Sequence, residues 1–414
     1  MIMDNTNADV IVIGGGAAGM MAAITAAKRG KKVVLIEKNR ILGKKMLITG
    51  KGRCNITNAC EDVETLLENV TVNRSFLYSS FYGFTNDDTI RFFNNLGVET
   101  KVERGNRVFP VTDKSQSVVD AMAKALKMTG VKIIHDTVVN IPVNENKISG
   151  VKTQKNGNIF ANSVIIATGG ASYKGTGSTG DGYKWAQDAG HTITDIIPSL
   201  VPIKVEEKWA YELMGLSLKN IKITVVNDKN KKIYTDFGEM MFAHFGLSGP
   251  VILSASAHMR PMFAGKYKII LDLKPALDEK TLDARLLRDF EKFSNRDFVN
   301  SLGELLPNTL IDTLVHLSGI DPRKKVNSIT KEERGRLVSL IKGIEFNVTD
   351  FCPIEQAIIT SGGVSVKEID PSTMQSKKVA GLYFAGEVID VDAYTGGFNL
   401  QIAFSTGWLA GMNC

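Results

Sequence analysis

Three glycines near the start of the chain have a spacing that suits a phosphorylated ligand. The segment VIVIGGGAAG carries them as Gly14-x-Gly16-x-x-Gly19. In such a pattern the first glycine permits a tight turn, the second lets the backbone approach a pyrophosphate, and the third lets helix and strand pack closely. Ala17 and Ala18 would begin the helix, whose free N–H groups and dipole attract an anion. The spacing therefore predicts a site for the diphosphate of a nucleotide.

An acidic side chain at a suitable distance narrows the class of ligand. Glu37 follows Gly19 by 18 positions, where a carboxylate can accept hydrogen bonds from both ribose hydroxyls and repels a 2′-phosphate. Lys38 comes next and is assigned to the same site. We therefore expect FAD or NAD at this position rather than NADP.

The elements that would position these residues are evident in the same stretch. Residues 8–13 are nearly all apolar, as in a parallel strand that is covered on both faces. Residues 17–29 are rich in helix formers, Gly30 ends the helix, and residues 32–36 form a second apolar strand. This order of strand, glycine turn, helix and strand predicts an α/β fold with a Rossmann-like parallel sheet.

A second glycine pattern occurs in the middle of the chain, as Gly175-x-Gly177-x-x-Gly180. The predicted strand at 163–168 ends well before it, and no acidic residue closes a following strand at the expected distance. We interpret this segment as a loop that enters a helix at 182–189. The chain is therefore expected to hold one dinucleotide tightly.

The closing segment could decide which dinucleotide is bound. A short strand at 382–385 is followed by a glycine pair that ends at Gly397 and by a helix from about residue 400. Backbone N–H groups of Phe398, Asn399 and Leu400 at that helix start could stabilise negative charge on the N1–C2=O edge of a reduced flavin. The alternative is a C-terminal helix with a purely structural role.

Length and charge place the chain among ordinary globular proteins of two or three domains. It has 414 residues, of which 43% are hydrophobic and 23% charged. Its 50 basic and 44 acidic residues give a net charge of +6, and the basic residues are spread along the chain. Without a basic run or an aromatic platform, a nucleic-acid partner is not expected.

Cysteine usage and the longest apolar stretch bear on the cellular compartment. Four scattered cysteines form no disulfide pattern and no CxxC pair for zinc. Residues 10–27 are uncharged, but the basic cluster follows the stretch instead of preceding it, and four of these residues are glycine. We therefore expect a cytoplasmic protein with no membrane segment.

Several longer motifs make the chain recognisable. The segments ATGGASY, TGDG and AGEV…GGFNLQ resemble flavoproteins of the glutathione-reductase-like and fumarate-reductase-like superfamily. More narrowly, GKGRCNITN, HFGLSGP and GGFNLQIAFSTG are similar to the BaiN-like family of FAD-dependent oxidoreductases, which also includes proteins described as aminoacetone oxidases and dehydro-bile-acid reductases. The resemblance covers essentially the whole chain and implies FAD as the cofactor.

Motif spacing and this resemblance together imply which residues contact FAD. The resemblance alone implies that Val138 would lie beside adenine, that residues 167–169 would lie beside the adenosine half, and that Glu387 would lie near the ribityl phosphate. It also implies that Asp181 of the TGDG turn would contact FAD. The residues assigned to the cofactor are Gly14, Gly16, Ala17, Ala18, Gly19, Glu37, Lys38, Met46, Thr49, Gly50, Gly52, Arg53, Cys54, Asn55, Val138, Ala167, Thr168, Gly169, Asp181, Gly386, Glu387, Gly397, Phe398, Asn399 and Leu400.

Two cysteines follow the first strand, helix and strand, where disulfide-reducing flavoenzymes keep a redox pair. Those enzymes use C-x4-C, whereas Cys54 and Cys60 are spaced as C-x5-C. The extra residue turns the second sulfur away from the first in a helix. We therefore expect two unpaired thiols.

The pattern changes after about residue 198, where strand-like and then helix-like segments suggest an insert. Strands are expected at 201–205, 218–226, 232–235 and 267–273, and helices at 282–293, 309–317 and 331–341. The predicted domains are 1–195, the first part of the FAD-binding domain; 196–275, a β-rich insert with antiparallel strands; 276–345, its helical part; and 346–414, the return to the FAD-binding domain. We expect the insert to cover the flavin and to shape the substrate pocket.

Two residues are candidates for catalysis. His244, in FAHFGLSGP, can titrate near neutrality and could donate a proton to a substrate carbanion. The alternative is a packed histidine with a structural role. Tyr394 precedes the closing glycine pair and is a candidate for the substrate pocket. No cluster of histidines or carboxylates predicts a metal site.

The sequence thus predicts an FAD-dependent oxidoreductase with a small-molecule substrate. Hydride would pass through flavin N5 from NAD(P)H, bound transiently, or from a small organic substrate to an enone-like acceptor or to oxygen. Two alternatives remain open at this stage: a flavin-containing protein that binds or modifies RNA, and an FAD-binding redox sensor. The sequence leaves the oligomeric state open.

Overall fold

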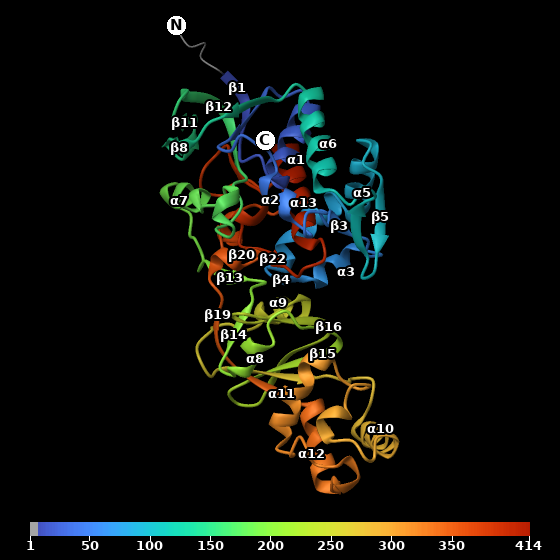
Figure 1. Ribbon diagram of the computed structural model, residues 1–414. Coiled ribbons are helices and arrows are strands. Elements are labelled where there is room, and N and C mark those ends of the chain that lie inside the picture. The colour runs from blue at the N-terminus through green and yellow to red at the C-terminus, as the bar shows by residue number, and fades with distance from the viewer. Residues whose placement is uncertain (1–6) are drawn as a thin grey trace. The chain divides into compact units, whose positions relative to one another are not determined.

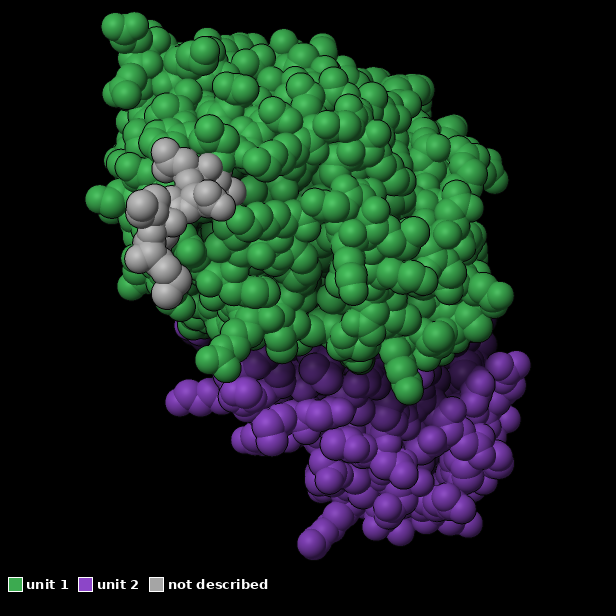
Figure 2. All heavy atoms as spheres, turned by 90° about the horizontal axis from the view of Figure 1, so that it is seen from above, with its two compact units in different colours: residues 1–199, 353–414 green, residues 200–352 purple. Residues whose placement is uncertain are grey.

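A computed structural model describes residues 7–414, and these divide into two compact units (Figure 2). Unit 1 contains the residues up to Ser199 together with Pro353–Cys414, and unit 2 is the continuous segment Leu200–Cys352. Each unit has its own sheet system. No helix within residues 7–414 is long and apolar enough to cross a membrane.

Unit 1 is built on a parallel sheet, which confirms the predicted Rossmann-like fold (Figure 1). Its parallel strands pair in the order β7 (Lys132–His135), β2 (Val33–Glu37), β1 (Asn7–Ile13), β12 (Gly157–Ile166) and β21 (Leu382–Phe384). Strand β12 also pairs with an antiparallel extension formed by β11 (Gly150–Thr153) and β8 (Val138–Asn140). Strand β2 is buried throughout, because helices cover the sheet.

Two helices from opposite ends of the chain pack against each other in unit 1. They are α1 (Ala17–Lys28) and α13 (Phe398–Asn413), and Figure 1 shows them side by side. A Cβ atom on Gly407 of α13 would lie 2.4 Å from the carbonyl oxygen of Ala18, and one on Gly411 would lie 2.5 Å from that of Ala22. Glycine is therefore needed at these two positions for the close contact between the helices.

Further elements complete unit 1. The helices are α2 (Lys44–Ile48), α3 (Val63–Glu68), α4 (Tyr78–Gly83), α5 (Asn86–Asn95), α6 (Ser115–Met128) and α7 (Asp181–Asp188). The remaining strands are β3 (Thr57–Asn58), β4 (Val70–Val72), β5 (Thr100–Glu103), β6 (Arg107–Pro110), β9 (Val143–Asn144), β10 (Lys147–Ile148), β13 (Ile197–Ser199), β20 (Ile359–Ser361) and β22 (Asp392–Ala393). The chain leaves unit 1 after β13 and returns before β20, and these two strands pair with each other.

Unit 2 contains a closed antiparallel barrel, in agreement with the predicted antiparallel insert. The strand order is β14 (Ile203–Val205), β17 (Gly246–Ser248), β16 (Lys232–Ala243), β15 (Ser217–Asn227), β18 (Tyr267–Asp272) and β19 (Ile344–Phe351). Its helices are α8 (Trp209–Glu212), α9 (Pro250–Ser256), α10 (Glu279–Lys292), α11 (Asn308–Ser318) and α12 (Lys331–Lys342). The barrel is closed because β19 pairs with β14 as well as with β18.

The boundaries between the units differ from the expected ones. The sequence placed the first boundary after residue 195, but β13 at residues 197–199 pairs with β20 inside unit 1. The last boundary was placed after residue 345, which cuts through β19. Because β19 closes the barrel, unit 2 continues to Cys352.

Candidate functional site

One cavity of unit 1 lies where the parallel strands end. The end of each strand provides residues that line the cavity: residues 136–138 after β7, Glu37 at the end of β2 with Lys38 and Asn39 after it, residues 14–16 after β1, residues 167–169 after β12, and residues 385–387 after β21. The cavity holds about 1360 Å³ of empty space, counted with its opening to solvent. Ligands of open α/β sheets bind in the crevice beyond the carboxyl ends of the strands.

The three glycines of the first motif have three different structural reasons to be glycine. Gly14 has a φ of +104°, and a Cβ there would lie 2.5 Å from the carbonyl oxygen of Ala167. A Cβ on Gly19 would lie 1.9 Å from the carbonyl oxygen of Gly14. A Cβ on Gly16, in contrast, would meet no protein atom within 4 Å. Gly16 thus leaves open space at the cavity wall, where a diphosphate could approach the backbone.

The first turn of α1 faces this space with free donors. Gly16 is the N-cap residue, and no side chain accepts a hydrogen bond from the helix start. The first N–H groups of a helix lack partners inside the helix and carry the positive end of its dipole. Ala17 and Ala18 line the cavity, so this helix end can bind an anion there.

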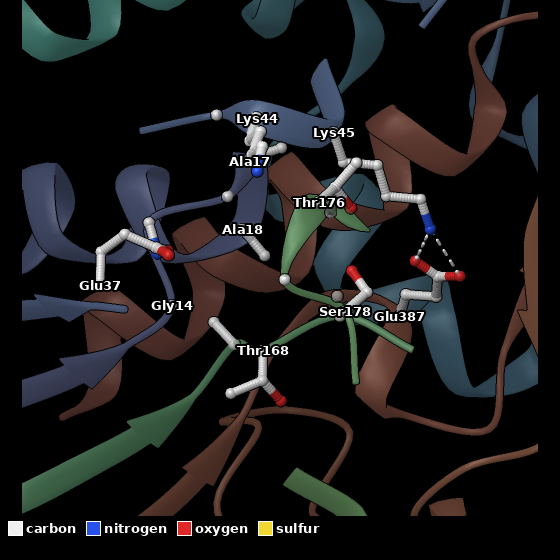
Figure 3. A pocket seen from close by; sticks show the side chains of 18 of the residues that line it. Gly14, Ala17, Ala18, Glu37, Lys44, Lys45, Thr168, Thr176, Ser178 and Glu387 are labelled. Atoms are coloured by element: carbon white, nitrogen blue, oxygen red, sulfur yellow. Dashed lines mark hydrogen bonds and ion pairs between the residues drawn. The ribbon is translucent and has the colours of Figure 1, made fainter. Parts of the chain in front are cut away.

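Glu37 lines the cavity, and its carboxylate already accepts hydrogen bonds from the protein (Figure 3). Its Oε2 accepts a hydrogen bond of 2.7 Å from the N–H of Gly15, and its Oε1 accepts two, each of 2.7 Å, from the backbone and side chain of Asn39. A carboxylate has about four lone-pair positions, so Oε2 retains capacity for a ribose hydroxyl. The sequence predicts contacts with both hydroxyls, but Asn39 competes with the ribose for Oε1.

The second glycine motif forms a loop before α7, as the sequence predicted, but it also borders the cavity. Thr176, Gly177 and Ser178 are among the lining residues, as is Asp181. Lys38 reaches this loop through hydrogen bonds to Thr179 and Asp181 of 2.5 and 2.7 Å. Burial opposes the ionisation of Asp181, but the bonds from Lys38 and Thr179 outweigh it and lower the pKa of Asp181.

The start of α13 contributes to the same cavity. Its N-cap, Gly397, has a φ of +103°, and a Cβ there would lie 2.3 Å from the carbonyl oxygen of Thr57. Asn399 holds the preceding loop through hydrogen bonds of 3.0 and 2.7 Å with the backbone of Ala393. Asn399 and Leu400 line the cavity together with Ala17 and Ala18. The starts of α1 and α13 therefore border one cavity.

Most of the residues assigned to the cofactor line this cavity. They are Gly14, Gly16, Ala17, Ala18, Glu37, Lys38, Met46, Thr49, Val138, Ala167, Thr168, Gly169, Asp181, Gly386, Glu387, Asn399 and Leu400. The assigned residues that do not line it are Gly19, Gly50, Gly52, Arg53, Cys54, Asn55, Gly397 and Phe398. Gly19 and Gly397 act instead by allowing close backbone contacts.

Arg53 and Cys54, which were assigned to the cofactor, interact instead with residues outside the lining of the cavity or are buried. Arg53 forms ion pairs with Glu103 and Asp113, and its guanidinium lies 4.1 Å from the centre of the Phe109 ring. Cys54 is fully buried, and burial raises the pKa of its thiol to about 12. The neutral thiol is a poor nucleophile, and the Cys60 thiol donates a hydrogen bond to Asn58.

The two candidate catalytic residues lie outside the lining of this cavity. His244 is exposed in the turn between β16 and β17 of unit 2, with its ring 4.7 Å from that of Phe245. Tyr394 follows β22 in unit 1, and its backbone bonds to Asn69 and Asn399. Among the residues that the structure describes, no cluster of histidine, cysteine and carboxylate side chains could hold a metal ion.

Sequence reasoning missed about half of the lining. The missed residues are Ile13, Gly15, Ile36, Asn39, Asp136, Thr137, Thr176, Gly177, Ser178, Trp185, Ile358, Ile359, Ala385, Val391, Ile402 and Ala403. Gly43, Lys44 and Lys45 also line the cavity, and the sequence indicates them only as part of a cationic loop that could lie beside a diphosphate. Several of the missed residues directly follow a predicted strand, so the strand ends themselves were a usable signal. Ile358 and Ile359 carry no such signal, because they reach the cavity only through the pairing of β20 with β13.

The residues present fit a long dinucleotide such as FAD. Adjacent strands lie about 4.8 Å apart, so the row of strand ends from β7 to β21 extends for about 19 Å. Open space at Gly16, two uncapped helix starts and a carboxylate at Glu37 are distributed along this row. The fold is therefore that of the Rossmann-like class of dinucleotide-binding proteins, and the lining of the cavity has the length and the donors to fit a dinucleotide.

The family follows from a comparison with known protein families. The model described as the HI0933-like protein Rossmann domain matches residues 8–413. The chain therefore belongs to the HI0933-like family, and the resemblance to FAD-dependent oxidoreductases is confirmed.

Two curated proteins align with almost the whole chain. A 3-dehydro-bile acid delta(4,6)-reductase of Clostridium scindens is 32% identical and covers 97% of both chains. A ribosomal RNA dihydrouridine synthase of Escherichia coli is 30% identical and covers 97% of this chain and 96% of its own. Among solved structures, a 3-ketosteroid delta1-dehydrogenase of Sterolibacterium denitrificans has 13% identity, 99% coverage of both chains and a TM-score of 0.53, a likeness of fold.

Proposed function

We propose that this FAD-dependent oxidoreductase uses NAD(P)H to reduce a carbon–carbon double bond that is conjugated to a carbonyl group. The choice of FAD as the cofactor is supported by one observation: the uncapped starts of α1 and α13 border the same cavity. When bound, FAD would supply hydride transfer through its N5 atom.

The chain's own residues would bind and orient the cofactor. N–H groups of Ala17 and Ala18 would hold the diphosphate beside the open space at Gly16, and Glu37 would accept a hydrogen bond from the adenosine ribose. The start of α13 at Asn399 and Leu400 would place its positive dipole end where negative charge develops on a reduced ring system.

The two relatives support the acceptor class by their shared chemistry. Reduction of a 3-dehydro-delta(4,6) bile acid saturates carbon–carbon bonds conjugated to a carbonyl, and dihydrouridine formation saturates such a bond in uracil. The common step is hydride addition to the carbon β to the carbonyl, followed by protonation of the α carbon. We propose a small enone as the substrate, in keeping with the more similar of the two relatives.

Anaerobic reduction tests this proposal. The purified protein, reconstituted with FAD, should lose its yellow absorbance when NADH or NADPH is added and regain it when a cyclic enone is added, with the saturated ketone as product. A saturated ketone of the same skeleton serves as the control acceptor. Failure to bind FAD would refute the cofactor proposal, and reoxidation by oxygen but by no enone would refute the acceptor class.

A second candidate is the reduction of uridine in ribosomal RNA. It is favoured by the 30% identity with the Escherichia coli dihydrouridine synthase over 97% of this chain. Incubating the reduced holoprotein with ribosomal RNA and analysing the nucleosides by mass spectrometry would detect dihydrouridine. If RNA reoxidises the flavin faster than every enone does, this second function replaces the first.

A further inference from the structure

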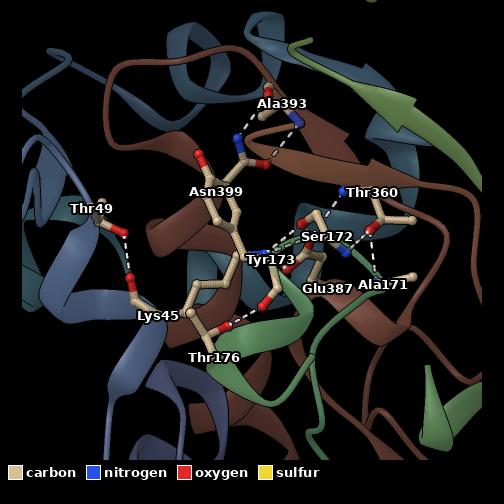
Figure 4. A network of polar contacts seen from close by, with 10 residues as sticks. All are labelled: Lys45, Thr49, Ala171, Ser172, Tyr173, Thr176, Thr360, Glu387, Ala393 and Asn399. Atoms are coloured by element: carbon tan, nitrogen blue, oxygen red, sulfur yellow. Dashed lines mark hydrogen bonds and ion pairs between the residues drawn. The ribbon is translucent and has the colours of Figure 1, made fainter. Parts of the chain in front are cut away.

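Four polar residues from separate segments meet at one wall of the cavity (Figure 4). Lys45 comes from α2, Ser172 from the loop after β12, Thr360 from β20, and Glu387 from the short helix η7 (Gly386–Val388). Lys45 and Glu387 are lining residues of the cavity. Figure 3 shows the Lys45 side chain extending from α2 toward the Glu387 carboxylate.

The ammonium group of Lys45 is fully engaged in this cluster. Its Nζ lies 2.8 Å from Oε2 and 3.1 Å from Oε1 of Glu387, and 2.9 Å from Oγ of Ser172. An ammonium has three N–H donors, and three oxygens surround this one. The Lys45 and Glu387 side chains are 25% and 19% exposed, so water screens the pair only weakly. In this position Lys45 has no donor left for a phosphate.

Thr360 binds the same carboxylate. Its backbone N–H donates a hydrogen bond of 2.9 Å to Oε1 of Glu387. Its Oγ1 accepts bonds of 2.8 and 3.0 Å from the consecutive N–H groups of Ala171 and Ser172. Thr360 is only 1% exposed, and a Cβ on Gly170 would lie 2.5 Å from its Oγ1. One buried residue thus contacts both segments: its side chain holds the loop after β12, and its backbone N–H holds Glu387 of the η7 segment.

The charge of this wall matters for an anionic ligand. A bare Glu387 carboxylate on the lining would repel the diphosphate of a dinucleotide, whereas a paired carboxylate presents little net charge. We propose that Lys45 and Thr360 are positioning residues that act through Glu387: Lys45 is its counter-ion and not a phosphate ligand, and Thr360 fixes its orientation. This inference rests on the proposed function, since FAD is taken as the occupant of the cavity.

A double-mutant cycle on FAD binding tests the role of Lys45. The apoprotein is titrated with FAD by the change in flavin fluorescence, for the wild type, Lys45→Met, Glu387→Gln and the double variant. If Lys45 neutralises Glu387, Lys45→Met weakens binding about tenfold or more, because the remaining charge is unpaired. The double variant should then bind within about threefold of Glu387→Gln, because no charge is left to neutralise.

The opposite result would overturn this role. If Lys45→Met costs as much affinity in the Glu387→Gln background as in the wild type, Lys45 contacts the phosphate directly. The midpoint of thermal unfolding of the four apoproteins gives a second reading that needs no cofactor. Absence of coupling between the two substitutions in that measurement also overturns the inference. Failure of the wild type to bind FAD would instead refute the proposed function. The wild-type titration therefore distinguishes that outcome from a failure of the role assigned to Lys45.

Thr360 is tested by a pair of substitutions that differ in the hydroxyl. Thr360→Val keeps the shape but leaves the N–H groups of Ala171 and Ser172 without their acceptor, whereas Thr360→Ser keeps the acceptor. We expect Thr360→Val to weaken FAD binding about tenfold and to shift the absorbance spectrum of the bound flavin, and Thr360→Ser to restore both.

A matched control separates positioning from general destabilisation. Thr153→Val removes an equally buried threonine hydroxyl that is hydrogen-bonded at a turn outside the lining of the cavity. It should lower the unfolding midpoint without changing the flavin spectrum. If Thr360→Val also lowers only the midpoint and leaves affinity and spectrum unchanged, Thr360 is structural and the inference fails.

Discussion

Gly16 and Gly19 are the residues at which ligand binding and folding can be separated most directly. Gly16 has an ordinary φ of −81°, and a Cβ there meets no protein atom within 4 Å. We therefore expect Gly16→Val to fold with nearly unchanged stability but to lose FAD binding by at least about a hundredfold, because the side chain fills the space of the diphosphate. Flavin fluorescence titration and apoprotein unfolding measure the two quantities.

Gly19→Ala should show the reverse pattern. A Cβ there would lie 1.9 Å from the carbonyl oxygen of Gly14, so α1 must move away from β1. Overpacking of this kind costs about 1–3 kcal/mol, which chemical denaturation of the apoprotein would measure. If Gly16→Val destabilised the apoprotein as much as Gly19→Ala, Gly16 would be a packing residue and the phosphate role would be lost.

Asp136, at the end of β7, gives a residue-scale prediction on pH. Burial opposes its ionisation, but hydrogen bonds from Asn156 and from the backbone N–H of Thr137 outweigh burial and lower the pKa of Asp136. A lowered pKa in the folded state means that the ionised carboxylate stabilises the fold above the unfolded pKa of about 4 and that this stability is lost on further acidification.

Asp136→Asn should therefore lower the free energy of unfolding at neutral pH by about 1–3 kcal/mol, since the amide N–H groups face backbone donors. The difference from the wild type should stay constant above a pH of about 4 and shrink as the pH falls below it toward the lowered pKa of the folded state. Urea unfolding at several pH values measures this trend, with the exposed Asp188→Asn as control. A difference that stays constant with pH would contradict the predicted role of the charge.

At the scale of elements, the contact between α1 and α13 sets the geometry of the site. Gly407 and Gly411 bring the backbone of α13 against Ala18 and Ala22 of α1. Gly407→Ala would place a Cβ 2.4 Å from the carbonyl oxygen of Ala18 and force the helices apart. We expect a loss of about 1–3 kcal/mol in unfolding free energy and a parallel loss of FAD affinity, because the two helix starts border one cavity.

Gly335 provides the matched control, because it also lies inside a helix, α12 of unit 2. A Cβ on Gly335 meets no atom within 4 Å, so Gly335→Ala should be neutral or stabilise the protein by up to about 1 kcal/mol. Calorimetry of both variants makes the comparison. If the two substitutions had the same effect, helix propensity and not the contact between α1 and α13 would determine stability.

Elements with a local signal were predictable from the sequence, and elements defined by distant pairing were less so. The glycine turn, α1 and β2 were found almost to the residue because propensity and spacing agree there. Strand β16 continues to Ala243, although the sequence predicts only residues 232–235. The prediction is too short because exposed polar residues such as Glu239 interrupt the apolar pattern of the strand. Strand β19 alternates buried and outward residues, and the boundary placed after residue 345 cut through that signal.

The difference between local signals and distant contacts also explains which residues of the candidate site could be predicted from the sequence. Glu37 and the first glycines line the cavity because a strand end alone determines their position. Arg53, in contrast, is held away from the lining by Glu103 and Asp113, which follow it by 50 and 60 positions. Thr360 was not singled out at all, since its contacts with Glu387 and the loop after β12 exist only in the folded unit.

At the scale of the whole molecule, the cavity belongs to one unit although the chain of that unit is interrupted. All residues that line it lie before Leu200 or after Cys352. The residues on either side of the interruption are already joined by the pairing of β13 with β20, in which Ser199 faces Ile359. Unit 2 forms a closed barrel with its own buried strands and therefore leaves no open sheet edge.

Removal of residues 200–352, with Ser199 joined directly to Pro353, should therefore leave a folded unit 1 that still binds FAD. Residues 353–358 would serve as the turn between β13 and β20, and loops of this length are common between paired strands. We expect FAD affinity within about tenfold of the full chain, because loop shortening changes stability only modestly. The segment 200–352 expressed alone should unfold cooperatively by circular dichroism. An excised unit 1 that folds but does not bind FAD would show that the cavity bordered by α1 and α13 is not sufficient for the cofactor.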